Sequence, residues 1–315
     1  MKNMRLPLII ALGVAIIGIV FGSFFDLQIS TAIANPNNGF GLAVSAVGPM
    51  LGFAGVAAMG GGFIAFILKG KYHVALKVLF GVLAAACFGV AIFYPAGEWF
   101  GVNGFYGAAP EWVGYLVVII PEAAAAVGGY FLFKEYKNDK LWIVFCIIIV
   151  LLLIALLAVI PTIKDNMHRP RYRYGVRTGF VDFHNWWQPF KEYKTQKNLY
   201  VSSKEHPIFI EGWEMTKDEY KSFPSGHTAE ASILLTIITF LPLADESFKK
   251  YQMPLFYGGC GLVVLVAFSR ILVGAHYLSD VSTGATVILA LLIIANEVVM
   301  RVKALHYEEQ EAPKE

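Results

Sequence analysis

Charged residues are scarce in this chain: Lys, Arg, Asp and Glu make up 15% of the 315 residues, whereas 57% are hydrophobic. An average soluble domain has about a quarter charged residues, so the surroundings of this chain must be mostly lipid. The net charge is only +2, and the basic residues are spread over short loops and one long loop. This distribution excludes a nucleic-acid-binding surface, and we expect the bilayer, not nucleic acid, as the partner.

Cysteine is also scarce. Cys87, Cys146 and Cys260 each lie in an apolar run, and the long polar loop has none. A disulfide framework and a CxxC metal site are therefore excluded, and we interpret the three cysteines as small buried hydrophobic residues. The two halves of the chain show no internal repeat, which argues against a transporter.

Long apolar runs, in contrast, are abundant. About 20 mostly apolar residues suffice to cross a bilayer. Lys2 and Arg5 precede the first run, which has no clear A-x-A cleavage site, so we expect an uncleaved first membrane helix. The sequence predicts an all-α, polytopic membrane helix bundle with about eight transmembrane helices, near residues 6–25, 41–68, 74–94, 112–133, 141–161, 223–243, 253–269 and 281–300.

The turns between these runs alternate between basic and base-free. Lys69 and Lys71 follow the second run, Lys134 and Lys137 follow the fourth, and further bases follow the sixth and eighth. By the positive-inside rule the basic turns are cytoplasmic. We therefore expect a multi-pass protein of the cell membrane with both termini in the cytoplasm and with segments 162–222 and 270–280 on the non-cytoplasmic face.

An acidic residue, Glu122, lies near the middle of the fourth run. An intramembrane acid is costly and is by default a functional candidate, but a neutral or hydrogen-bonded structural role is equally compatible with the sequence.

Cationic residues gather where the fifth run ends, in the segment Lys164-Asp-Asn-Met-His-Arg-Pro-Arg171. Further on, Phe223-Pro-Ser-Gly-His-Thr228 opens the sixth helix. The N-terminus of a helix presents unpaired N-H groups, and Gly226 lets the backbone approach an anion closely. We also note Arg169 and Arg173 beside these residues, where the sequence does not separate a phosphate contact from a headgroup contact.

A third motif lies between the seventh and eighth runs. Ser269-Arg270 is followed after five residues by His276 and after three more by Asp280. If 276–280 forms the first helical turn, the i,i+4 spacing lets Asp280 reach the imidazole of His276. A carboxylate on one ring nitrogen would fix the tautomer and leave the other nitrogen as a nucleophile.

These three segments resemble the type 2 phosphatidic acid phosphatase family, whose signature is K-x6-R-P, P-S-G-H and S-R-x5-H-x3-D. The second and third motifs match completely; in the first, Tyr172 replaces the proline. A register on Arg169-Pro170 would place Thr162 at the lysine position, and we reject it. The resemblance implies a phosphatase core at 141–300 with a long non-cytoplasmic loop, 162–222, after N-terminal transmembrane helices at 1–140 and before a cytoplasmic tail at 301–315.

The resemblance also implies a mechanism. His276 attacks phosphorus and forms a phosphohistidine, Asp280 orients its ring, and His227 is the general acid and base. Phosphate would be bound by Lys164, Arg171, Ser225, Gly226 and Arg270. Three cations take the place of a metal ion, so we expect a metal-independent, acid phosphatase-type hydrolase with no cofactor.

The substrate implied is a lipid phosphate: phosphatidate, phosphatidylglycerol phosphate, or an undecaprenyl or other isoprenoid diphosphate. The sequence does not choose among them, nor does it set an oligomeric state. Three alternatives stay open: a lipid phosphotransferase with the same site, a vanadium haloperoxidase, and a non-catalytic anion transporter or binding protein.

The long loop is aromatic in part, with Phe180, Trp186, Trp187, Phe190 and Tyr193. Such a loop can be an interfacial anchor or lid over a lipid headgroup, or it can simply pack on the helix bundle. The sequence favours neither.

Overall fold

The computed structural model describes residues 4–69, 71–100, 111–134, 141–178, 183–190, 217–244 and 246–311. Within these ranges the chain is all helical and has no strand. The elements are α1 (Arg5–Ile33), α2 (Gly39–Leu68), α3 (Val74–Phe100), α4 (Glu111–Lys134), α5 (Leu141–Ile154), the π-helical turn η1 (Ala155–Val159), α6 (Ile160–Met167), α7 (Tyr172–Thr178), the 3-10 turn η2 (Lys217–Tyr220), α9 (Gly226–Ala244), the 3-10 turn η3 (Glu246–Lys250), α10 (Gln252–Leu272) and α11 (Leu278–Glu311).

Eight helices of the described chain are long and apolar enough to cross a membrane, which confirms the predicted fold class. They span Arg5–Ile33, Gly39–Leu68, Val74–Gly97, Trp112–Lys134, Cys146–Met167, Gly226–Leu243, Gln252–Leu272 and Leu278–Val302.

Some helix ends differ from the predicted ones. α1 continues to Ile33 because no helix breaker occurs before Pro36, so Asp26 lies inside a helix and not in a linker. The fifth span continues past Pro161 to Met167, and the π-helical turn just before this proline accommodates its missing N-H. Lys164 is therefore helical. The predicted tail is helical as far as Glu311, and part of the predicted long loop forms α7 and η2.

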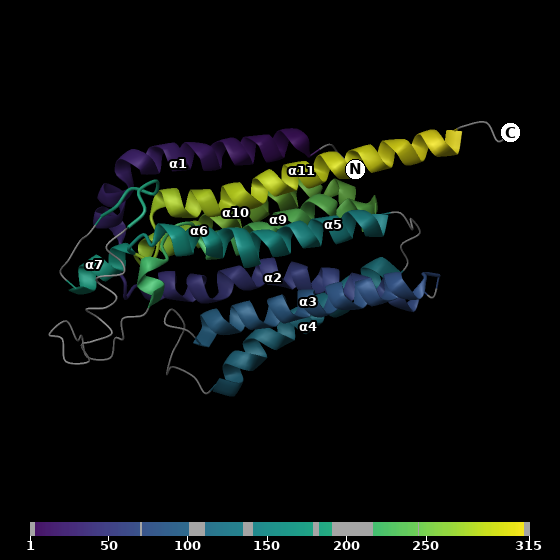
Figure 1. Ribbon diagram of the computed structural model, residues 1–315, viewed down its shortest axis with the longest axis horizontal. Helices are drawn as coiled ribbons and strands as arrows, with labels where there is room; N and C mark the ends of the chain where they lie inside the picture. Colours follow the sequence, from purple (N-terminus) through teal and green to yellow (C-terminus); the bar gives the residue numbers. More distant parts are fainter. Residues whose placement is uncertain are drawn as a thin grey trace.

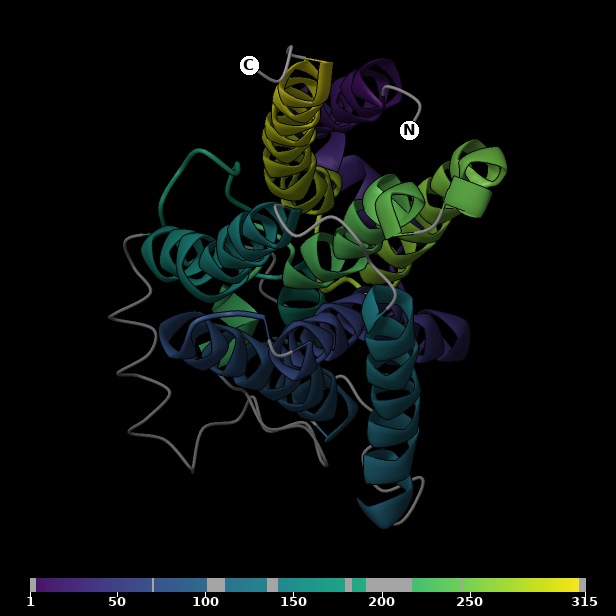
Figure 2. The same ribbon diagram turned by 90° about the vertical axis from the view of Figure 1, so that its right-hand side faces the viewer.

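The helices run side by side along the long axis of the molecule (Figure 1). Seen from one end, α1 and α11 lie together at one edge of the bundle and α4 lies at the opposite edge (Figure 2). α2 is central, since it packs against α3, α4, α9 and α10. Helices from the first part of the chain are thus in direct contact with those of the last part.

Large apolar side chains cover the outside of the bundle as well as its core. On α1, Leu6, Ile17 and Phe24 are each at least 67% exposed, whereas Phe53 and Phe63 of α2 are completely or almost completely buried. A helix surface of this kind is suited to lipid contact and not to water.

Glu122 is buried on α4, with only 3% of its surface exposed. Neither of its carboxylate oxygens has a hydrogen-bond partner among the described residues. The described residues therefore offer no hydrogen-bond partner that would support a structural role for Glu122.

Both α1 and α11 have their terminal ends at the end of the bundle opposite to α7 (Figure 1). The side of the membrane on which α7 lies stays a prediction from loop charge. We expect a cysteine replacing exposed Gln188 to react with an impermeant thiol reagent in intact cells, and one replacing exposed Lys71 not to react. Cys87, Cys146 and Cys260 would first be replaced by alanine, and labelling would be measured by mass shift. The reverse labelling pattern would place the α7 end in the cytoplasm.

Candidate active site

The first motif lies where α6 ends. His168 adopts a left-handed conformation with φ of 48° and caps the helix, and the chain then crosses the end of the bundle. Lys164, one turn before this cap, donates from Nζ to the carbonyl of Lys221 at 3.0 Å. Arg171 is 4% exposed, and its Nη2 lies 2.7 Å from Oδ2 of Asp218. Its Nε and Nη1 have no hydrogen-bond partner among the described residues, so two buried donors are available to an anion.

The segment around η2 keeps these arginines in place. The N-H of Arg171 donates to the carbonyl of Glu219 at 2.8 Å. The Glu219 carboxylate, in turn, pairs with Arg173 at 2.9 Å. Arg173 therefore has a protein carboxylate as its partner, and we assign it no phosphate contact.

The second motif forms the start of α9. Ser225 precedes the helix, and its Oγ accepts hydrogen bonds from the N-H of Thr228 at 3.4 Å and from the Thr228 hydroxyl at 3.1 Å. A Cβ on Gly226 would lie 4.0 Å from Nζ of Lys164 and 3.3 Å from Oε1 of Glu230. The ammonium of Lys164 is thus close to the first turn of α9, where helical N-H groups favour an anion.

The third motif lies between α10 and α11. Arg270 is fully buried near the end of α10, and its carbonyl accepts the N-H groups of Ala275 at 3.0 Å and His276 at 3.2 Å. Gly274, with φ of 65°, makes the turn between the helices. This turn brings His276 back beside the end of α10.

His276 is 1% exposed, and its Nδ1 lies 2.5 Å from the carbonyl oxygen of Ser222. A carbonyl only accepts, so Nδ1 bears the proton and Nε2 of the neutral ring has the free lone pair. Burial lowers the pKa of His276 well below its usual value, and the nearby charges of Arg171, Lys164, Arg270 and His227 lower it further. The ring is therefore neutral at neutral pH, as a nucleophile requires.

Asp280 lies farther from this ring than the i,i+4 spacing predicts. Its Oδ2 is 3.9 Å from Nδ1 of His276, which is too long for a hydrogen bond. The same oxygen accepts instead from the Ser222 hydroxyl at 2.5 Å and from the N-H of Tyr277 at 2.8 Å. The Asp280 carboxylate thus contacts Ser222, and the carbonyl of Ser222 contacts His276. Sequence reasoning had not identified Ser222.

Arg169 is completely buried and uses its whole guanidinium for protein contacts. Nη1 donates to Asp280 at 2.5 Å, Nη2 donates to Asp26 at 2.9 Å, and Nε donates to the carbonyl of His184 at 2.8 Å. Burial alone would lower the pKa of Arg169, but the carboxylates of Asp280 and Asp26 more than offset this and raise the pKa. Arg169 therefore has protein partners for its guanidinium, and we assign it no contact with phosphate or headgroup. Its partner Asp26 directly follows the first apolar run, and sequence reasoning placed it in a linker and did not identify it.

The aromatic residues of the long loop are described only in part, since Phe180 and Tyr193 lie outside the described residues. Trp186 stacks on Phe223 with ring centroids 5.5 Å apart and donates to the hydroxyl of Ser23 at 2.8 Å. Phe190 is 2% exposed, whereas Trp187 is 48% exposed. Trp186 thus packs against α1, and Phe190 packs with Tyr174 and Tyr220. Trp187 is the more exposed of the described aromatic residues of this loop.

All eight candidate residues lie at one end of the bundle, at or next to the ends of α6, α9, α10 and α11. They are His276, His227, Asp280, Lys164, Arg171, Ser225, Gly226 and Arg270. Among the described residues, no group of three His, Cys, Asp or Glu side chains is placed to hold a metal ion. A helical membrane bundle with histidines and cations gathered at one end has the features of a membrane phosphatase.

The chain belongs to the PAP2 superfamily, whose family model matches residues 141–304, slightly more than half of its length. This is a superfamily of phosphatase-type hydrolases, which confirms the resemblance found in the sequence. No curated protein and no solved structure matches the chain closely enough to add to this assignment.

The start of α9 is seated directly on α11, and this contact requires glycine at position 284. A Cβ there would lie 2.2 Å from the carbonyl oxygen of Ser225. We expect Gly284→Ala to move Ser225 and His227 away from His276, to destabilise the fold by about 1–3 kcal/mol, and to lower activity. Thermal unfolding and turnover would be measured beside Gly261→Ala on α10, where a Cβ meets nothing within 4 Å. Equal behaviour of the two variants would contradict the proposed importance of this contact.

Proposed function

We propose that this protein hydrolyses a lipid phosphate through a phosphohistidine formed on His276. The observation that supports this most directly is the state of the His276 ring. It is buried and neutral, Nδ1 is bonded to the Ser222 carbonyl at 2.5 Å, and Nε2 is left as a nucleophile near three cations. A histidine with a purely structural role would not need this surrounding charge.

The three cations would bind the phosphoryl group. Lys164 lies beside the first turn of α9, Arg171 has two buried donors without a protein acceptor among the described residues, and Arg270 influences the His276 ring electrostatically. Phosphoryl transfer needs mostly positioning and stabilisation of charge on the equatorial oxygens. The Ser225 hydroxyl and the Gly226 N-H would add neutral donors, so the site itself supplies the charge that a metal ion would otherwise provide.

The proposed reaction has two steps, as the family resemblance implies. Nε2 of His276 forms a bond to phosphorus while the bond to the leaving oxygen breaks, and His227 gives its proton to that oxygen. Water then attacks phosphorus and gives a proton to His227, while the bond from phosphorus to Nε2 breaks and returns its electron pair to the ring. Inorganic phosphate then leaves. His227 is suited to both roles because it is on the first turn of α9 and its charge acts on His276.

Asp280 would orient His276 through Ser222 and not by direct contact. Its Oδ2 accepts the Ser222 hydroxyl, and the Ser222 carbonyl accepts the proton on Nδ1 of His276. This arrangement fixes the tautomer as a direct carboxylate would, with one residue inserted between them.

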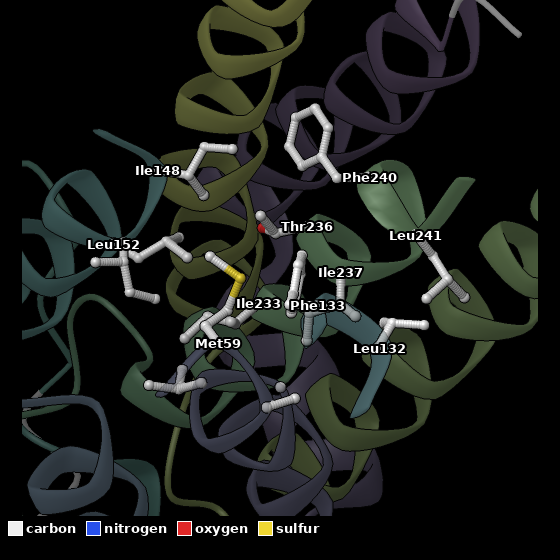
Figure 3. Close-up of a pocket in the computed structure, with 14 residues that line it drawn as sticks. Met59, Leu132, Phe133, Ile148, Leu152, Ile233, Thr236, Ile237, Phe240 and Leu241 are labelled. Atoms are coloured by element: carbon white, nitrogen blue, oxygen red, sulfur yellow. The ribbon is translucent and has the colours of Figure 1, made fainter. Parts of the chain in front are cut away.

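An apolar cavity of about 40 Å³ lies inside the helix bundle (Figure 3). It lies between α2, α4, α5 and α9, and its lining includes Met59, Phe133, Ile233 and Phe240. Ile233 is six residues after His227, which corresponds to about 9 Å along α9 at 1.5 Å per residue. Phe240 lies 13 residues after His227, about 20 Å along α9, and none of the eight candidate residues lines the cavity. We therefore infer a lipid as the substrate from the membrane-spanning helices and the family, and not from this cavity.

The two histidines should respond differently to substitution. His276→Ala removes the nucleophile, so neither phosphoenzyme nor product should form. His227→Ala should lower turnover of a lipid phosphate by about 10² to 10⁴, and less for p-nitrophenyl phosphate, whose leaving group needs little protonation. Turnover would be measured with both substrates, and acid-labile phosphate on the protein would be measured with labelled substrate.

His73, an exposed histidine outside the motifs and just before α3, provides the control, and His73→Ala should retain activity. We expect phosphoenzyme to accumulate in His227→Ala, since the same imidazole activates water in the second step. Substantial turnover by His276→Ala, or label on another residue, would show that His276 is not the nucleophile.

A further inference from the structure

A carboxylate from the first helix reaches the active-site end of the bundle. Asp26 lies on α1, before the segment that matches the family model, and is 1% exposed. Its Oδ1 accepts the N-H of Ser279 at 2.9 Å, and its Oδ2 accepts the Ser279 hydroxyl and Nη2 of Arg169. A buried carboxylate with this many donors has a fixed orientation.

The helix is shaped to bring Asp26 to this position. A Cβ on Gly22, one turn earlier, would lie 2.6 Å from the N-H nitrogen of Ser279 and 2.7 Å from Oδ1 of Asp26. α1 and the start of α11 can approach this closely only because position 22 has no side chain. The contact between Asp26 and α11 is therefore direct and needs no bridging residue.

Arg169 joins Asp26 to Asp280. Its Nη1 donates to Asp280 Oδ1 and its Nη2 donates to Asp26 Oδ2, so each carboxylate engages a different end of one guanidinium. Without Asp26 the buried Nη2 would lose its acceptor, and the planar group could rotate to place both ends on Asp280. Such a rotation would turn the Asp280 carboxylate and weaken its contact with the Ser222 hydroxyl.

Further hydrogen bonds connect Asp280 to His276, the proposed nucleophile. Oδ2 of Asp280 accepts the Ser222 hydroxyl, and the carbonyl of Ser222 accepts from Nδ1 of His276. All of these groups are buried, with at most 1% of each side chain exposed, so their contacts are little screened by water.

We propose that Asp26 is a positioning residue of the active site, which holds Arg169 so that Asp280 and Ser222 keep His276 in the orientation and tautomer needed for attack. This inference rests on the proposed role of His276 as the nucleophile. The first helix, α1, would thus help to position the catalytic residues of the segment that matches the family model.

The test is Asp26→Asn, which keeps the size of the side chain and removes its charge. We expect kcat to fall about 10- to 100-fold, as is typical when a partner behind a reacting group is removed. KM should change little, because Lys164, Arg171 and Arg270 are untouched. Phosphoenzyme formation in a single turnover should slow by the same factor as kcat, and Asp26→Glu, which restores the charge, should be more active than Asp26→Asn.

Glu297→Gln is the matched control. Glu297 and Arg5 form another ion pair between α11 and α1, at 3.6 Å and partly exposed. Its loss should leave kcat and KM unchanged. If Asp26→Asn does not fold, Asp26→Asn combined with Arg169→Gln removes both charges together, and the same loss of kcat at unchanged KM is expected.

The outcomes separate the two claims. Wild-type protein that releases no phosphate from any lipid phosphate would contradict the proposed function itself. Wild-type turnover with an unchanged kcat in the folded Asp26 variant, or a variant weakened only in its unfolding temperature, would contradict the positioning role of Asp26 alone.

Discussion

The active-site end of the bundle depends on the ion pairs of Arg169 with Asp26 and Asp280. They join three separate parts of the chain: α1, the segment after α6, and α11. Removing one partner of a buried ion pair typically costs about 3–5 kcal/mol, because the remaining charge is left uncompensated. Replacing a whole buried ion-pair set by apolar residues often costs little stability. We therefore propose that the set is retained because it fixes the geometry around His276.

This arrangement also keeps two groups of cations apart. Arg169 pairs with Asp26 and Asp280, and Arg173 pairs with Glu219. Arg171 also pairs with Asp218 through Nη2, but its Nε and Nη1 have no acceptor among the described residues. Alternate arginines in this segment therefore have different surroundings, and in our proposal Arg171 is the one that presents donors to a phosphate.

The fold and the family could be predicted from the sequence, because the fold depends on the length of apolar runs and the family shows in motifs of short, fixed spacing. The eight membrane helices follow from the length of the apolar runs. The convergence of Lys164, Ser225 and His276 at one end follows from the positions of the motifs together with the directions of the helices. The contact between Asp280 and Ser222 could not be predicted, because it depends on how the chain before α9 packs against the turn before α11. The same is true of Asp26, since pairing residues 143 positions apart requires the tertiary structure.

The central claim is that the protein itself transfers phosphate from a lipid to water without a metal ion. Its most direct test is the release of inorganic phosphate by purified protein from phosphatidate, phosphatidylglycerol phosphate and undecaprenyl diphosphate, with EDTA present and no acceptor added. The account predicts phosphate release from at least one of these lipids at an undiminished rate in EDTA, and inhibition by vanadate. Release that stops on chelation, or that begins only when an acceptor alcohol is supplied, would contradict it.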